Sequence, residues 1–484
     1  HAAIENIYSR VSGRYPSQIF GKLGVLGDAN LFLLNPNGII FGENSSLDIK
    51  GSFFASTASS FDFGEGNNYS AINPTAPPLL SVSVKAPVGL EFEGGEGDIE
   101  NQGNLVVGKD FTLQGNNLNL QGRLEAGKDL TLKAEDTVKV RDSVEKAFIA
   151  ASGDKLLIQG KKSVDIFALN HSGSGLFSGG DMILSSKNPV NGDIHFWSGG
   201  NFQIENNNGN LGSLYSPNGS IIRAGGDVSF NSYAGSSLHI FAGGSVNVPG
   251  EIKITGRDTA QNSIRERITL SDGTTVVDID GNSKATLDIR AGTKAVGELG
   301  IVGSGDDFST VPITDGNGTS ADINIGGVSV EAADGLVFLS NRYHSDESKK
   351  DGSIGVEYIF ADDYTFLGNA GSVFIDSGRD IDVTAIYSYS SSGNGGDINL
   401  LADNSIDLQQ ANILSYSSFG KSGNVNLFAN NSIQLERSLI NSSTTAGREN
   451  GVDISINPPQ LALKGTSVIT AGTSTRSSGD GGNI

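Results

Sequence analysis

The sequence predicts an all-β protein that folds as a right-handed parallel β-helix, a solenoid in the form of a single elongated rod with a few extra-helical loops or hairpins. Three observations predict this fold. A glycine turn followed by a short strand recurs about every 18–26 residues in the first half. A second repeat of about 25–30 residues occupies the C-terminal part, and no stretch shows the apolar period of an α-helix.

The first repeat is clearest where DIENQGNLVVGKDFTLQ at 98–114 is followed by NLNLQGRLEAGKDLTLK at 117–133. Apolar residues alternate with polar ones in each strand, which is the period of a β-strand. The turn and strand recur as far as GGSVNV at 243. A unit this short cannot bury its apolar face alone, so successive units must stack and pair their strands.

The second repeat aligns one apolar position in each unit: Val373, Ile398, Val425, Ile454 and Ile484. We expect these side chains to point into the core. A β-propeller is the main all-β alternative, but its blades of four antiparallel strands need longer units than the shortest repeats here.

These patterns divide the chain into four segments, which are residues 1–95, 96–255, 256–365 and 366–484. The second segment has repeats of about 18–26 residues, the third is an irregular β-helix with insertions, and the fourth has repeats of about 25–30 residues and is truncated at its end. Because GDGGNI ends the sequence within a repeat, we expect the chain to be cut there.

Three stretches interrupt the repeats. Residues 73–89 hold four prolines and predict an extended crossing between two parts of the helix. Residues 256–285 predict a hairpin that bulges from the rod, and the charged residues 341–353 predict an exposed loop. Ordinary variation in loop length explains the last two, and a recognition loop is the alternative.

The composition limits the classes of partner. The 66 glycines suit a fold with many tight turns, because glycine tolerates positive φ. The absence of cysteine excludes a disulfide scaffold and thiolate metal sites. With 54 acidic and 33 basic residues the formal charge is −21, which disfavours nucleic acid as a partner. No apolar run is long enough for a membrane-spanning helix.

The most specific motif lies near the start of the chain, where NLFLLNPNGIIFG at 30–42 precedes the strand-like LDIKGSFFAST at 47–57. This region resembles the secretion domain (haemagglutination activity domain) of two-partner-secretion exoproteins, the filamentous haemagglutinin and haemolysin family. The resemblance covers about the first 95 residues. The hallmark NPNGI of the family stands here as Asn35, Pro36, Asn37, Gly38 and Ile39.

The hallmark also makes sense without the family. Pro36 fixes φ and Gly38 accepts positive φ, so the motif predicts a β-turn between two strands. The resemblance implies that this secretion-motif turn also serves recognition by the transporter or folding after export. The start of the family's domain, with a second motif NPNL in many members, is expected to lie before His1.

The resemblance implies an outer-membrane β-barrel transporter as the partner during export. It also implies a secreted or cell-surface protein that crosses the periplasm and outer membrane of a Gram-negative-type bacterium unfolded and then folds outside. We interpret the chain as an adhesin-like exoprotein whose β-helix is a rigid scaffold and attachment surface. The expected ligands are host-cell or matrix glycans or proteins, and the expected state is a monomeric rod without cofactor or metal.

Two alternatives stay open. One is a β-helical polysaccharide-degrading enzyme, and the other is the stalk of a haemolysin or toxin-delivery exoprotein. The enzyme would need convergent carboxylates, and Asp380 and Asp382 could share a face of one strand, although solvated turn residues are the more common case. GNLVVGKD at 103–110 approaches a phosphate-binding loop, but Asp110 replaces the final Ser or Thr and a strand follows instead of a helix. We therefore predict no catalytic residues.

Aromatic residues provide the candidate binding residues. Tyr387 and Tyr389 alternate in AIYSYSSSG, and Trp197 lies in DIHFWSGG. On an outward face these rings would stack on sugars. Inward stacking in the core is the alternative and the more common arrangement.

Overall fold

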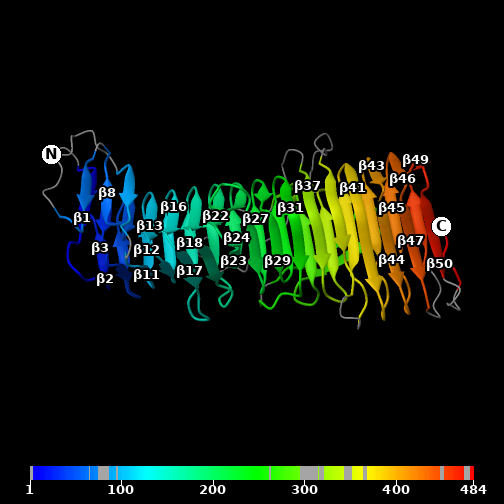
Figure 1. Ribbon diagram of the computed structural model, residues 1–484, viewed down its shortest axis with the longest axis horizontal. Coiled ribbons are helices and arrows are strands. Elements are labelled where there is room, and N and C mark those ends of the chain that lie inside the picture. Colours follow the sequence, from blue (N-terminus) through cyan, green and yellow to red (C-terminus); the bar gives the residue numbers. More distant parts are fainter. Residues whose placement is uncertain are drawn as a thin grey trace. The chain divides into compact units, whose positions relative to one another are not determined.

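The computed structural model confirms the predicted parallel β-helix (Figure 1). It describes residues 4–64, 66–74, 87–93, 96–260, 263–294, 314–315, 321–342, 352–363, 368–446, 452–473 and 480–484. Every regular element in these residues is a strand, and among them no helix could serve as a membrane span. The described residues form two compact units, one up to residue 213 and one from residue 214 onward.

Each coil of the first unit contributes three strands, which pair with the strands of neighbouring coils along three faces. The first face contains β1 (Asn6–Arg10), β4 (Asn30–Leu34), β7 (Phe53–Ser56), β13 (Phe111–Gly115), β16 (Leu130–Ala134), β19 (Leu156–Gly160), β22 (Met182–Ser186) and β25 (Phe202–Glu205). The second contains β2 (Ser17–Ile19), β5 (Ile39–Phe41), β11 (Ile99–Asn101), β14 (Leu118–Leu120), β17 (Thr137–Arg141), β20 (Ser163–Phe167) and β23 (Val190–Asp193). The third contains β3 (Lys22–Gly24), β6 (Ser46–Asp48), β12 (Asn104–Val107), β15 (Arg123–Ala126), β18 (Ile149–Ser152), β21 (Gly175–Ser178) and β24 (Phe196–Ser198).

The second unit repeats this plan with longer strands that run through the corner between two faces. These strands are β31 (Val246–Ile254), β37 (Ile323–Val330), β39 (Ile354–Phe360) and β41 (Asp380–Ser390). Around them the same two faces contain β26 (Ser213–Ser216), β28 (Val228–Ser229), β29 (Ser232–Gly235), β43 (Ser405–Gln409), β44 (Asn412–Ser417), β46 (Ser432–Glu436), β47 (Leu439–Thr444), β49 (Gln460–Lys464) and β50 (Val468–Thr473). The third face contains β27 (Ser220–Ala224), β30 (Leu238–Ala242), β34 (Thr286–Arg290), β38 (Leu336–Ser340), β40 (Ser372–Ser377), β42 (Ile398–Ala402), β45 (Val425–Ala429) and β48 (Ile454–Asn457).

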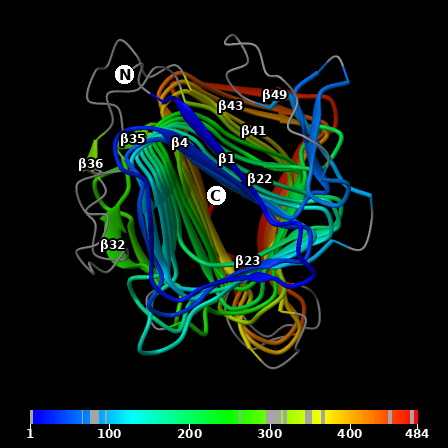
Figure 2. The ribbon, with the colours of Figure 1, turned by 90° about the vertical axis from the view of Figure 1, so that its left-hand side faces the viewer.

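The strands pair in register, so side chains of one kind form rows along the stack. One fully buried row in the first unit consists of Leu113, Leu132, Ile158, Leu184 and Ile204. Figure 2 looks down the stack of coils. In each unit the coils surround an interior that such rows fill. Each row removes apolar surface from water, which contributes a stabilising free energy of about 25 cal/mol per Å² buried. Stacking therefore stabilises units that would not fold alone.

The apolar positions aligned from the second repeat occupy one such row. Val373, Ile398, Val425 and Ile454 are in register with one another and buried. This confirms the predicted core positions. Ile484 differs, because its side chain is exposed and the residue lies outside any strand.

Three small antiparallel sheets depart from the coils in the described residues. In the first unit β8 (Ser60–Asp62) pairs with both β9 (Asn68–Ser70) and β10 (Gly89–Glu91). In the second unit β32 (Arg265–Thr269) pairs with β33 (Val276–Asp280), which confirms the predicted hairpin. A short pair, β35 (Thr293–Lys294) and β36 (Thr314–Asp315), follows. Most of the predicted proline-rich crossing and of the predicted charged loop lies outside the described residues.

Candidate functional site

The turn between β4 and β5 carries the NPNGI motif. Asn35 is fully buried, and its Oδ1 accepts hydrogen bonds from the backbone N–H of Asn37 at 3.0 Å and from its Nδ2 at 3.2 Å. The N–H of Gly38 donates to the carbonyl oxygen of Asn35 at 3.1 Å and closes a β-turn. Gly38 has φ of +115°, a conformation that side chains rarely adopt.

Two asparagine side chains bond this turn to the coil before it. Nδ2 of Asn35 donates to the carbonyl oxygen of Tyr15 at 3.1 Å and to Oγ of Ser17 at 2.9 Å. Nδ2 of Asn37 donates to the carbonyl oxygen of Gly13 at 2.8 Å. All the hydrogen-bonding capacity of the Asn35 amide is therefore used inside the protein, which explains why a buried polar side chain is tolerated here.

The following coil closes over the other side of the turn. The N–H of Gly97 donates to the carbonyl oxygen of Pro36 at 2.7 Å, and the N–H of Ile39 donates to that of Asp98 at 3.0 Å. A Cβ at Gly97 would lie 2.5 Å from the backbone of Asn37. The motif is thus a junction through which one coil is bonded to both neighbours.

This geometry lies inside the part of the chain that matches a known family. Residues 1–204 match the family model of the TPS secretion domain. The chain is a two-partner-secretion exoprotein. No curated protein matches it. The family predicted from the NPNGI motif is therefore confirmed, and the matched region extends beyond the first 95 residues that carry the motif and its flanking sequences.

The TPS domain determines how the exoprotein leaves the cell. Proteins with this domain are secreted across the outer membrane through the transporter of a two-partner system, which is the partner that the domain implies. Within it, the NPNGI turn is a fully hydrogen-bonded part of the β-helix and not a projecting loop.

The TPS domain also has an outward aromatic row on its first face. Tyr8 and Phe32 stack at 4.8 Å between ring centroids, and Phe32 and Phe54 stack at 5.9 Å. The antiparallel sheet covers this row, with Phe61 fully buried against it. A groove of about 570 Å³ lies beside the row, lined by Phe32, Phe54, Pro87, Val88, Gly89, Leu90, Phe92, Gln114, Lys133, Ala134, Glu135, Gln159 and Lys161.

Trp197 lies on the outward side of β24, in register with Phe177 and through it with Ala151 and Glu125, but it is covered. Its side chain is only 3% exposed, and its ring centroid lies 6.2 Å from that of Phe177. A ring this deeply buried offers no face to a ligand. The interpretation of Trp197 as a glycan-stacking residue is therefore corrected.

Tyr387 and Tyr389 lie on the outward side of β41. Their side chains are half-buried. Ile386, which precedes Tyr387, and Ser388, which lies between the two tyrosines, are fully buried. Tyr387 contacts Phe360 of the preceding coil at 5.3 Å, and Tyr389 stacks on a tyrosine of the next coil at 4.4 Å. We call the outward rings of these coils the aromatic ledge: Tyr358, Phe360, Tyr387, Tyr389 and Tyr416.

The sequence interpretation missed three members of this ledge, Tyr358, Phe360 and Tyr416. The signal was present, because Phe360 precedes Tyr387 and Tyr416 follows Tyr389 by one coil in exact register. Comparing outward positions between repeats would have found these rings.

Asp362 lies at the edge of the ledge. Its Oδ1 accepts a hydrogen bond from the backbone N–H of Tyr389 at 2.8 Å. Burial raises the pKa of Asp362 to about 6, although this hydrogen bond lowers it. The folded protein therefore binds a proton at Asp362 more tightly than the unfolded chain does.

We expect Asp362→Asn to raise the melting temperature at pH 7 to 8. A folded-state pKa near 6 means that the stability contributed by the protonated group is complete below the unfolded pKa of about 3.9 and is lost as the pH rises through about 6. Asparagine keeps the acceptor for Tyr389 without the charge. Melting curves between about pH 4 and pH 8 test this, and parallel pH profiles of variant and wild type would contradict it.

Asp380 and Asp382, the acidic residues considered for hydrolysis, make different contacts. Asp380 bonds to the next coil, because its Oδ1 accepts from Nδ2 of Asn404 at 2.7 Å and from Oγ of Ser405 at 2.5 Å. Asp382 is exposed, and its register partner in the next coil is Asp407. Asp380 therefore links its coil to the next one. Among the described residues, no cluster of three His, Cys, Asp or Glu side chains could hold a metal ion.

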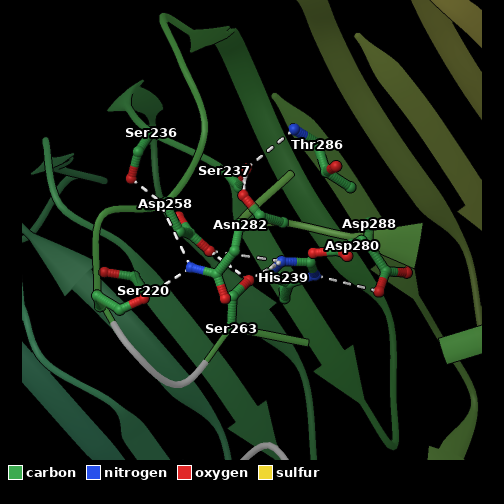
Figure 3. A network of polar contacts seen from close by, with 12 residues as sticks. Ser220, Ser236, Ser237, His239, Asp258, Ser263, Asp280, Asn282, Thr286 and Asp288 are labelled. Carbon is green, nitrogen blue, oxygen red and sulfur yellow. Dashed lines mark hydrogen bonds and ion pairs between the residues drawn. The ribbon is translucent and has the colours of Figure 1, made fainter. Parts of the chain in front are cut away.

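A buried polar network fixes the hairpin to the third face of the second unit (Figure 3). Nδ1 of His239 lies 3.2 Å from Oδ2 of Asp288, and its Nε2 lies 3.3 Å from Oγ of Ser263. Oγ of Ser263 donates to Oδ2 of Asp258 at 2.6 Å, and Oγ of Ser236 donates to Oδ1 of Asp258 at 3.0 Å. The network joins β30 and β34 to the insertion that covers them.

This arrangement brings together the residue types of a serine hydrolase, but its geometry is structural. The Ser263 hydroxyl donates to Asp258, so its proton is not directed at His239. A Cβ at Gly281 would lie 2.2 Å from Oγ of Ser263 and 2.5 Å from Nε2 of His239. The backbone of Gly281 thus occupies the space where a substrate would have to approach.

The same face holds two buried arginines. Nε and Nη2 of Arg290 donate to the two oxygens of Asp288 at 2.8 and 2.9 Å. Arg223 lies over the ring of Phe241 at 4.7 Å, and burial and the charge of Arg290 lower the pKa of Arg223 to about 10. Because these charges are buried, the contact between the hairpin and this face is stable only while each charge keeps its partners.

Proposed function

We propose that this exoprotein is adhesin-like, and that the aromatic ledge of its second unit is an attachment surface for host-cell or matrix glycans. The ledge is the observation that supports the proposal. Half-buried aromatic rings of neighbouring coils gather on one outward face, and clusters of this kind mark binding surfaces.

The β-helix supplies a rigid support for this surface. Each ring is fixed by the register of its strand, and Tyr389 also bonds through its hydroxyl to Oγ of Ser418 at 3.1 Å. Rings held in this way lose little side-chain entropy on binding a ligand. Repeated coils would present further weak contacts to a polymeric ligand, so that avidity exceeds the affinity of one site.

We propose that the protein acts by attachment and not by hydrolysis. Asp380 is bonded to the next coil, and the Ser263 hydroxyl is committed to Asp258. Neither arrangement leaves a carboxylate or nucleophile facing a sugar-sized space.

The test is retention of the purified protein on immobilised polysaccharides and host-cell glycans, with new reducing ends scored in the same samples. We expect retention without cleavage. The double substitution Tyr387→Ala, Tyr389→Ala should weaken retention about tenfold, because one aromatic contact contributes about 0.5–1.5 kcal/mol.

Tyr215→Ala is the matched control, since Tyr215 is an exposed tyrosine outside the ledge. Its retention should equal that of the wild type. Cleavage of a glycan would contradict the proposed attachment role. Equal retention by all variants would show that the ledge is not the attachment surface.

A further inference from the structure

The aromatic ledge ends abruptly along the stack of coils. The outward row that contains its last ring runs through Tyr389, Tyr416, Ser443 and Gly472, each in register with the next. Two large rings are thus followed by two positions with almost no side chain. The outward surface drops by the height of a tyrosine between β44 and β47.

Tyr416 forms the wall of this step. Its ring stacks on Tyr389 at 4.4 Å with 23° between the planes. Because strands of neighbouring coils are about 4.8 Å apart, rings stacked in this way have their normals along the stack. One face of Tyr416 is therefore covered by Tyr389, and the other is directed over Ser443 and Gly472.

The floor of the step is small and polar. The neighbouring outward row continues from Leu414 to Asn441 and Thr470. Oδ1 of Asn441 is buried within this floor and has no hydrogen-bond partner among the described residues. A Cβ at Gly472 would meet only Thr470 Cγ2, at 3.8 Å, among the described atoms, so this floor has room above it.

The charge near the step is negative. Burial raises the pKa of Tyr416, and the neighbouring tyrosines and Asp362 raise it further. The whole chain carries a formal charge of −21. Sulfated, sialylated or uronic-acid glycans would be repelled from such a surface, whereas an uncharged sugar would not.

We propose that the step bounded by Tyr416, Asn441, Ser443 and Gly472 binds one pyranose unit of a neutral glycan. Two coils give a floor roughly 10 Å wide, which accommodates a single sugar ring. The C–H face of the sugar packs against the free face of Tyr416, and its hydroxyls hydrogen-bond to the hydroxyl groups of the floor. This inference rests on the proposed attachment function and names its ligand class and subsite.

Ser443→Tyr is the decisive variant. A tyrosine at this position would continue the ladder from Tyr416 and fill the step, and stacked rings in register favour the fold. We expect it to reduce retention on neutral galactan and glucan at least tenfold while the melting temperature is unchanged or higher. Tyr416→Ala should reduce retention similarly, and Ser443→Ala should retain most of it.

Heparin and chondroitin sulfate are the anionic probes, and Tyr215→Ala is the control, because Tyr215 is exposed and lies outside the ledge. The full chain should bind the neutral polymers better than the anionic ones. Full binding by Ser443→Tyr, with loss in the Tyr387 and Tyr389 double variant, would overturn the step and keep the ledge. Preference for sulfated polymers would overturn the neutral ligand. Binding to no glycan would overturn both proposals.

Discussion

Asp288→Asn should lower the free energy of unfolding of the second unit by about 3–5 kcal/mol. Asp288 is fully buried, and it pairs with Arg290 through both oxygens and with His239 at 3.2 Å. An amide cannot neutralise Arg290, so the substitution leaves the buried guanidinium without the charge of Asp288, and Glu266 remains as an acidic partner. The hairpin that lies over this face should then detach before the coils unfold.

The effect should depend on pH. Burial alone would raise the pKa of Asp288, but the charge of Arg290 and the hydrogen bond and charge of His239 outweigh it and hold the pKa below its usual value. A carboxyl whose folded pKa is lowered stabilises the protein above the unfolded pKa of about 3.9 and loses this contribution as the pH falls further. Wild type and variant should therefore differ fully at pH 7 and converge in strong acid.

Urea unfolding followed by circular dichroism at pH 7 and at about pH 3 measures both parts of this prediction. Asp278→Asn is the control, because Asp278 pairs with Arg267 on the same hairpin but both side chains are mostly exposed. Its effect should be small, as for other exposed ion pairs. Equal losses in the two variants would show that the buried network has no special role.

The fold was predictable because its signals are local. Alternation by two and a glycine turn in each unit determine which side chains of a strand point inward, as the buried row through Val373, Ile398 and Val425 shows. The hairpin was predictable for the same reason, since the repeat fails there. The NPNGI turn was recognisable from four residues whose backbone preferences agree.

The buried network was not predictable, because it joins residues far apart in the chain on a face that is covered by an insertion. In β27, β30 and β34 every side chain is buried, inward and outward alike. Where an insertion covers the outer side of a sheet, alternation no longer reports exposure. The outward position of His239 carries a polar contact that no local pattern contains.

The direction of Tyr387 and Tyr389 was undetermined for a different reason. Hydrophobicity favours tyrosine inside and serine outside, but the structure has the reverse. The inward serines satisfy the carbonyl groups of the glycine turns, as Oγ of Ser388 does by donating to Gly371 at 2.8 Å and Oγ of Ser415 does by donating to Gly396 at 2.8 Å. Backbone groups left without these partners would cost more than partial exposure of two rings.

Asn35→Ala should destabilise the TPS domain by about 2–4 kcal/mol. The substitution removes a fully buried amide, and it leaves the N–H of Asn37 and the carbonyl of Tyr15 without their partner. Thermal melting of the purified chain measures the loss. Asn37→Ala is the matched control in the same motif; it should cost less, because Asn37 is exposed and loses only its bond to Gly13 and one to Asn35.

Gly97→Ala separates folding from recognition. The substitution changes no NPNGI side chain. Its Cβ would lie 2.5 Å from the backbone of Asn37 and force the coils apart, which lowers the free energy of unfolding by about 1–3 kcal/mol. We expect secretion through the partner transporter to fall in step with stability in both Asn35→Ala and Gly97→Ala, since the motif is a junction between coils. Normal export of Gly97→Ala, together with blocked export of Asn35→Ala at equal stability, would instead show that the transporter reads the asparagine itself.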